Sequence, residues 1–94
     1  MLQNIDDNIN AILFLISRKY GKINYIFEGD VFINVNLNIN YTVIEILDNT
    51  VILKELIFDS ETKKLVLDPY SSKAIVESEE NLLENYKHLC NVKF

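Results

Sequence analysis

The first segment of the chain spaces its apolar residues as an amphipathic helix does. Between residues 5 and 20 they recur at intervals of three and four, which places them on one face. Arg18 and Lys19 suit the negative end of a helix dipole, and Gly21 provides a left-handed stop. We therefore predict a helix over residues 5–20, with Phe14 and Leu15 lying off the stripe that faces the core. That stripe consists of Ile5, Ile9, Ile12, Leu13, Ile16 and Tyr20.

The next clear pattern alternates with a period of two. The odd-numbered positions from Val31 to Tyr41 are apolar, and most of the even-numbered positions between them are asparagine. This alternation predicts a strand with one buried and one open face. Because the run is long for one strand, we expect a bend or a bulge to divide it. The residues expected to face solvent are Asn34, Asn36, Asn38 and Asn40, and those expected to be buried are Ile33, Val35, Leu37 and Ile39.

Further strands flank this pattern. Residues 22–28 also alternate, which predicts a strand that ends in a hairpin turn with Gly29 at positive φ. The alternation changes phase at 42–45, where we expect a bulge or a turn. Residues 50–58 are rich in β-branched side chains and favour a strand, although their spacing also permits a short helix. Tight turns are expected at 48–49 and 59–63, and short strands at 65–67 and 74–76.

The last segment has the signals of a second helix. Ser78 is a candidate N-cap, and Glu79 and Glu80 follow it at the end of the helix that favours acids. The spacing of the apolar residues predicts a helix over 79–91, with His88 on its polar side beside Glu84. The whole chain then forms a single α+β domain over 1–94. It comprises an N-terminal helix, an antiparallel meander of four to five strands, and a C-terminal helix packed on the sheet.

Charge and composition narrow the function. The chain has 94 residues and a net charge of -5, and its nine basic residues are scattered, which argues against direct binding of nucleic acid. The apolar run at 11–16 is too short for a signal peptide or a membrane span. A single cysteine, Cys90, cannot form an internal disulfide. We therefore expect a cytoplasmic protein that does not bind membranes.

Residue types that carry catalysis are scarce. His88 and Cys90 lie two positions apart, so a regular helix would not bring both to one metal ion. The chain has neither a Gly-x-Ser-x-Gly nucleophile motif nor a glycine-rich phosphate loop. Its carboxylate pairs fall at expected helix starts and turns, where acids are common. The sequence therefore predicts a protein that is not an enzyme and has no cofactor and no metal.

Three groups of residues remain as candidates for binding a partner. The acids around the C-terminal helix would attract a basic site, although they also fit an ordinary solvated helix face. The asparagine row offers hydrogen-bonding groups, although codon bias also accounts for it. The two apolar residues off the first helix stripe would be covered by a partner. These candidates are Glu77, Glu80 and Glu84, then Asn34, Asn36 and Asn38, and finally Phe14 and Leu15.

We hypothesise that this small acidic protein binds another protein and inhibits or adapts it. Its composition is typical of an AT-rich genome, as in phage-type mobile elements that encode inhibitors of host defence proteins. An immunity protein or an antitoxin that neutralises a toxin is the alternative in the same class. A small-ligand-binding protein or an enzyme that uses the polar strand face is the alternative from another class. Apolar residues on both faces of 43–58 also leave a homodimer open.

Overall fold

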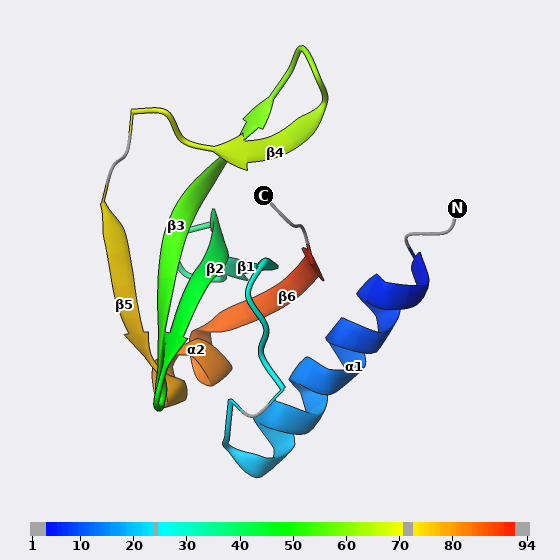
Figure 1. Ribbon diagram of the computed structural model, residues 1–94, viewed down its shortest axis with the longest axis vertical. Helices are drawn as coiled ribbons and strands as arrows, with labels where there is room; N and C mark the ends of the chain where they lie inside the picture. The colour runs from blue at the N-terminus through cyan, green and yellow to red at the C-terminus, as the bar shows by residue number, and fades with distance from the viewer. Residues whose placement is uncertain (1–3, 24, 71–72, 92–94) are drawn as a thin grey trace.

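The sheet has six strands in the part of the chain that the structure describes. A computed structural model describes residues 4–23, 25–70 and 73–91, with side chains from residue 9 onward. The strands follow the order β4-β3-β2-β1-β6 with antiparallel pairing, and β5 also pairs with β3 (Figure 1). The predicted α+β fold is confirmed, but the described part of the chain has six strands where four to five were expected, because β6 replaces the end of the predicted second helix. The elements of the fold are α1 (Asn4–Tyr20), β1 (Asp30–Asn34), β2 (Ile39–Leu47), β3 (Thr50–Asp59), β4 (Lys64–Leu67), β5 (Ala74–Ser78), α2 (Glu79–Asn85) and β6 (Tyr86–Asn91).

The expected long strand is a hairpin, because a turn built on Asn34 interrupts it. Asn34 Oδ1 accepts the backbone N–H groups of Asn36 at 2.9 Å and of Leu37 at 3.0 Å. Asn38 takes positive φ, which asparagine tolerates better than most residues. The predicted orientation of the row is therefore wrong at this end, since Asn34 is only 7% exposed and Val35 is 47% exposed. The residues between β1 and β2 form no polar strand face.

The turn changes which substitution should cost more stability. Alternation predicts that Val35 is buried and Asn34 exposed, whereas the structure buries Asn34 and exposes Val35. Replacing Asn34 by alanine removes the acceptor of two backbone donors and should lower the free energy of unfolding by about 1–3 kcal/mol. Replacing the exposed Val35 by alanine should change the same free energy by less than about 0.5 kcal/mol. Urea denaturation of the two variants beside the wild type measures both values. A larger loss for Val35→Ala would contradict the turn.

Several local predictions along β2 to β5 are confirmed. The register between β2 and β3 shifts between Val43 and Glu45, where the phase change predicted a bulge. Asp48 and Lys63 take positive φ in the two expected tight turns, and residues 50–58 belong to a strand. A further strand lies where 74–76 predicted one. Each of these features is determined by residues close together in the sequence, so local patterns were enough to predict them.

The predicted strand at 22–28 is wrong. The segment is a loop in which Ile23 and Ile26 are buried, and the N–H of Ile26 donates to the carbonyl of Ile23 at 3.2 Å. This spacing of three places the two isoleucines on one side of a turn, where a strand would place them on opposite faces. Asn24, within the same predicted strand, lies outside the described residues. Gly29 does take positive φ, as expected.

The second helix is shorter than predicted. It begins after the Ser78 cap, as expected, but ends at Asn85, and residues 86–91 form β6 against β1. The edge of β1 offers hydrogen-bond partners to the backbone of residues 86–91. A local sequence pattern does not show that this edge is nearby. The change from helix to strand brings His88 onto the sheet, so its predicted place on a polar helix face beside Glu84 is wrong.

The first helix is confirmed, but its buried face is not the predicted one. Phe14 is 3% exposed and Ser17 is buried, whereas Ile9, Ile12 and Tyr20 are exposed. Figure 1 shows α1 set to one side of the sheet, and its contacts are mainly with β6. A helix that packs mainly on the edge strand buries a narrow face, and the ring of Phe14 occupies it and reaches Phe32 on β1. Ile5, at the start of the predicted stripe, lies outside the residues whose side chains are described.

Candidate functional site

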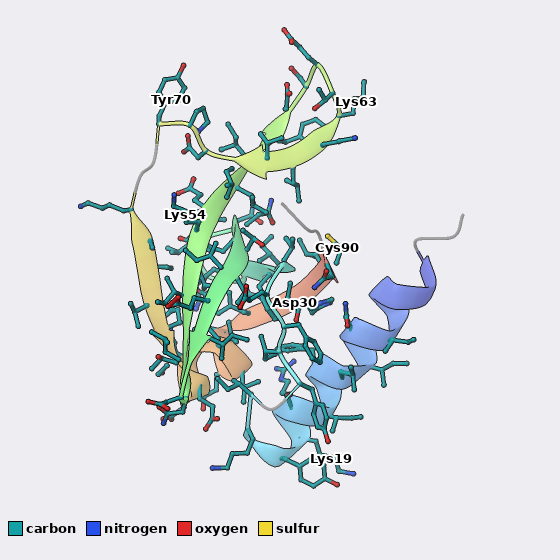
Figure 2. The ribbon with its side chains drawn as sticks, viewed as in Figure 1. Lys19, Asp30, Lys54, Lys63, Tyr70 and Cys90 are labelled. Carbon is teal, nitrogen blue, oxygen red and sulfur yellow. The ribbon has the colours of Figure 1, made fainter. Side chains whose placement is uncertain are left out.

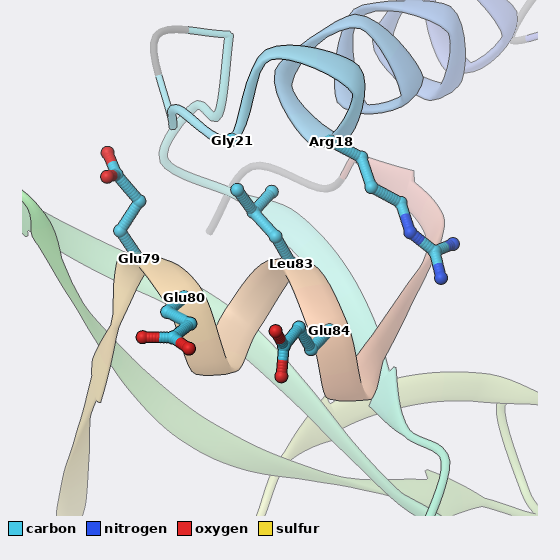
Figure 3. Close-up of a pocket in the computed structure, with 6 residues that line it drawn as sticks. All are labelled: Arg18, Gly21, Glu79, Glu80, Leu83 and Glu84. Carbon is cyan, nitrogen blue, oxygen red and sulfur yellow. The ribbon is translucent and has the colours of Figure 1, made fainter.

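Two pockets within the described chain share Arg18, at the junction of α1, α2 and β6. The larger, of about 590 Å³, is called the acidic pocket here. The smaller, of about 330 Å³, is called the histidine pocket. Arg18 lines both, so the two pockets adjoin at its side chain, and together they are called the groove around Arg18. The acidic pocket is lined by Arg18, Gly21, Glu79, Glu80, Leu83 and Glu84 (Figure 3), and the histidine pocket by Ala11, Phe14, Leu15, Arg18, Lys87 and His88.

The acidic pocket is built on the first turns of α2. Ser78 caps the helix by accepting the N–H of Asn81 at 3.1 Å. Glu79 accepts the N–H of Ile23 at 3.1 Å, which ties the loop after α1 to α2. Glu80 and Glu84 are exposed one turn apart, and neither forms an ion pair within the described residues. Two like charges at this spacing repel each other slightly. Glu80 lies in the first turn of α2, where the helix dipole favours an acid, whereas Glu84 lies beyond that turn.

The histidine pocket lies over a buried contact between a carboxylate and an imidazole. Asp30 is fully buried near the centre of the molecule (Figure 2), and its Oδ1 lies 3.0 Å from Nε2 of His88. The same carboxylate accepts the N–H of Phe27 at 2.9 Å and the side-chain amide of Asn91 at 2.9 Å. The rings of Phe14 and Phe32 pack against the imidazole, with centroid distances of 6.1 and 5.3 Å. The imidazole is therefore held in one orientation.

A chain of side-chain hydrogen bonds accounts for Glu77. One of its oxygens accepts the hydroxyl of Tyr86 at 2.5 Å, and the other accepts the amide of Asn81 at 2.6 Å. Asn81 in turn accepts from Asn85, and Asn85 accepts from Asn36 at 3.3 Å. Glu77 thus joins β5 to α2 and β6, and Asn36 joins the β1–β2 turn to α2. Both residues have internal partners that their sequence positions did not indicate.

The Tyr86–Glu77 contact makes the stability depend on pH at the alkaline end. Burial, followed by the hydrogen bond to Glu77, raises the pKa of Tyr86 well above its usual value. The unfolded chain loses this proton near pH 10 and the folded chain keeps it, so stability is full below about pH 10 and falls as pH rises. The expected slope is at most about 1.4 kcal/mol per pH unit for each such tyrosine.

Urea denaturation at several pH values up to about pH 11 measures this slope. Tyr86→Phe should have a shallower slope than the wild type. It should not abolish the slope, because burial also raises the pKa of Tyr41. Equal slopes in the two proteins would contradict the assignment to Tyr86.

The structure places only some of the sequence-predicted binding residues at the two pockets. Glu80 and Glu84 line the acidic pocket, and Leu15 lines the histidine pocket with 59% of its surface exposed. Phe14 belongs to the core, so the prediction that it lies off the buried face is wrong. The remaining four are in the hydrogen-bond chain or the β1–β2 turn, namely Asn34, Asn36, Asn38 and Glu77.

Sequence reasoning missed Asp30, Lys87 and the shared role of Arg18. Asp30 and His88 lie 58 positions apart, and their contact depends on a strand that the pattern presented as helix. Arg18 carried one signal, since it is the single arginine of the chain and lies one turn beyond Phe14 and Leu15. That signal did not indicate what would surround it.

Comparisons with protein-family models, with curated proteins and with solved structures find no match to this chain. Among the described residues, no three His, Cys, Asp or Glu side chains are grouped so that they could hold a metal ion. Over the same part of the chain, neither helix combines the length and the apolar character needed to cross a membrane.

Proposed function

We propose that this chain acts by binding another protein at the groove around Arg18, and that it thereby inhibits or adapts that protein. One observation carries the proposal. Glu80 and Glu84, which have no ion partner in the described residues, line the acidic pocket, and the exposed apolar side chain of Leu15 lines the adjoining histidine pocket. Charges without an ion partner next to exposed apolar surface are typical of an interaction site.

The chemistry of the groove defines the partner. Ile12 and Leu15 are 56% and 59% exposed, and they would pack against apolar side chains. Glu80 and Glu84 would pair with a lysine or an arginine beside that apolar contact. The net charge of -5 attracts such a basic site over a longer range and speeds the encounter. An inhibitor of this kind needs only a complementary face and no catalytic group.

The available surface is sufficient for one such interface. The chain exposes 6391 Å² in all. A standard protein interface covers about 800 Å² on each partner. The exposed residues of α1 and the two pockets around Arg18 are the candidates for that area.

Affinity capture from cells that carry the native gene tests the proposal with a matched pair of variants. Glu80→Lys/Glu84→Lys reverses the groove charges. Glu45→Lys/Glu61→Lys makes the same change in net charge at exposed positions on the β2–β3 and β3–β4 hairpins. We expect the wild type and the hairpin variant to retain the same protein, and the groove variant to lose it. A partner retained equally by all three would place the binding site elsewhere.

The identity of the retained protein separates the more specific functions. A host defence protein would support an inhibitor of the phage or mobile-element type. A toxin would support an immunity protein or an antitoxin. Both functions use the same basic and apolar recognition, so the groove supports either one.

A second copy of the chain is the other candidate occupant. Ile9, Ile12 and Leu15 form an exposed apolar face on the side of α1 that the sheet does not cover. Burying such a face between two copies would stabilise a homodimer. Sedimentation at micromolar concentration should then show a dimer for the wild type and a monomer for Leu15→Lys. Two monomers would exclude the homodimer and leave the heteromeric proposal in place.

A further inference from the structure

We propose that the histidine pocket binds a small oxyanion, a carboxylate or a phosphate, between Arg18, Lys87 and Nδ1 of His88. The His88 side chain is only 2% exposed. Its Nδ1 is buried and has no hydrogen-bond partner in the described part of the chain. A buried polar atom without a partner is unfavourable and uncommon in folded proteins. The adjacent pocket is where a ligand could supply that partner.

The surroundings of the imidazole determine which nitrogen is available. A carboxylate only accepts hydrogen bonds, so the contact with Asp30 places a proton on Nε2 of His88. Asp30 is itself held by Phe27 and Asn91, and the ring packs against Phe14 and Phe32. The ring cannot turn over without breaking these contacts. Nδ1 is therefore the atom left for a ligand.

The charged residues of the histidine pocket favour an anion. Arg18 and Lys87 are exposed, and neither forms an ion pair with the residues that the structure describes. Figure 3 shows the Arg18 side chain extending from α1 toward β6, the strand that carries Lys87 and His88. A guanidinium group binds carboxylate and phosphate oxygens through paired hydrogen bonds. Arg18 also borders the glutamates of the acidic pocket, and Asp30 contacts the other nitrogen of His88, so the positive charge of the site comes from Arg18 and Lys87 alone.

The rest of the lining limits the size and character of the ligand. Ala11, Phe14 and Leu15 are apolar and suit a short hydrocarbon group attached to the anion. Because Nδ1 is buried, an oxygen reaches it only when an exposed lining side chain moves aside, and Leu15, Arg18 and Lys87 are exposed. An anionic oxygen accepts from a protonated Nδ1. A protonated phosphate oxygen donates to a neutral one.

The test uses the purified chain alone, so its failure would leave the proposed protein-binding function unaffected. His88 is the single histidine of the chain, and its imidazole nitrogen signals in NMR spectra therefore need no assignment among several residues. The isotope-labelled protein is titrated with inorganic phosphate and, separately, with butyrate at constant ionic strength, with sodium chloride as the control. We expect a saturable shift of the Nδ1 signal with at least one oxyanion, and the effective one identifies the source of the oxygen.

Two variants assign the shift to the pocket. Arg18→Gln/Lys87→Gln should weaken binding by roughly tenfold or more, as the loss of charge-assisted hydrogen bonds does. Lys64→Gln/Lys73→Gln removes the same charge at exposed positions away from this pocket and should bind as the wild type does. A Nδ1 signal that phosphate and butyrate move no more than chloride does would overturn the proposal. Equal binding by the Arg18/Lys87 variant and the wild type would overturn it as well.

Discussion

Replacing Phe32 by alanine is expected to lower the free energy of unfolding by about 3–5 kcal/mol. Phe32 is completely buried on β1. Its ring meets those of Phe14, His88 and Tyr86 at centroid distances of 5.0, 5.3 and 6.5 Å. The substitution removes these contacts together and leaves a cavity between α1 and the sheet. A domain of this size has only about 5–15 kcal/mol of stability, so the loss is a large share of the total.

Urea denaturation followed by circular dichroism measures the effect. Phe58→Ala is the matched control, because Phe58 lies on β3 with 62% of its surface exposed. We expect the control to lose less than about 1 kcal/mol. Similar losses for Phe32→Ala and Phe58→Ala would contradict the aromatic cluster as the contact that holds α1 to the sheet.

Replacing Asp30 by alanine is expected to cost about 3 kcal/mol or more. The substitution removes the carboxylate shared by three partly buried groups, on Phe27, His88 and Asn91, although the Asn91 amide also donates to the carbonyl of Glu28. Each buried donor that loses its partner costs about 1–3 kcal/mol. The cost is high because Asp30 is buried. If the site were exposed, water could bind the donors that lost the carboxylate, and little stability would be lost.

Glu61→Ala serves as the control for Asp30→Ala in the same denaturation experiment. Glu61 is exposed in the β3–β4 turn, where a surface substitution changes stability by less than about 0.5 kcal/mol. The His88 imidazole signal gives a second readout, because losing the Asp30 contact changes the environment of Nε2. Equal stabilities of the two variants together with an unchanged imidazole signal would contradict the buried pair.

The sequence predicted those parts of the fold that depend on neighbouring residues. β-Branched side chains favoured the strand at β3, turn residues predicted the turns at Asp48 and Lys63, and the change of phase predicted the bulge after Val43. Alternation failed in the run of asparagines, because Asn34 forms a turn through its own side chain. A period of two does not distinguish such a turn from a strand.

The remaining features depend on contacts between distant segments. Residues 86–91 space their apolar positions as a helix does, but the free edge of β1 pairs with them as β6. The buried face of α1 was missed because a single ring, Phe14, docks against Phe32 and His88. The residues of the candidate site also divide into those that local sequence indicates and those that depend on contacts between distant segments. Glu80, Glu84 and Leu15 could be predicted as surface residues, whereas Asp30 and His88 meet only in the folded chain.

The rate of association with the captured partner, measured by stopped flow at low and high salt, tests the role of the groove most directly. We expect the wild type and Glu45→Lys/Glu61→Lys to associate more slowly as salt rises. Glu80→Lys/Glu84→Lys should associate more slowly than both at low salt, with a smaller change in its dissociation rate and almost none in its stability. An association rate that neither salt nor the reversal of Glu80 and Glu84 changes would contradict binding at the groove around Arg18.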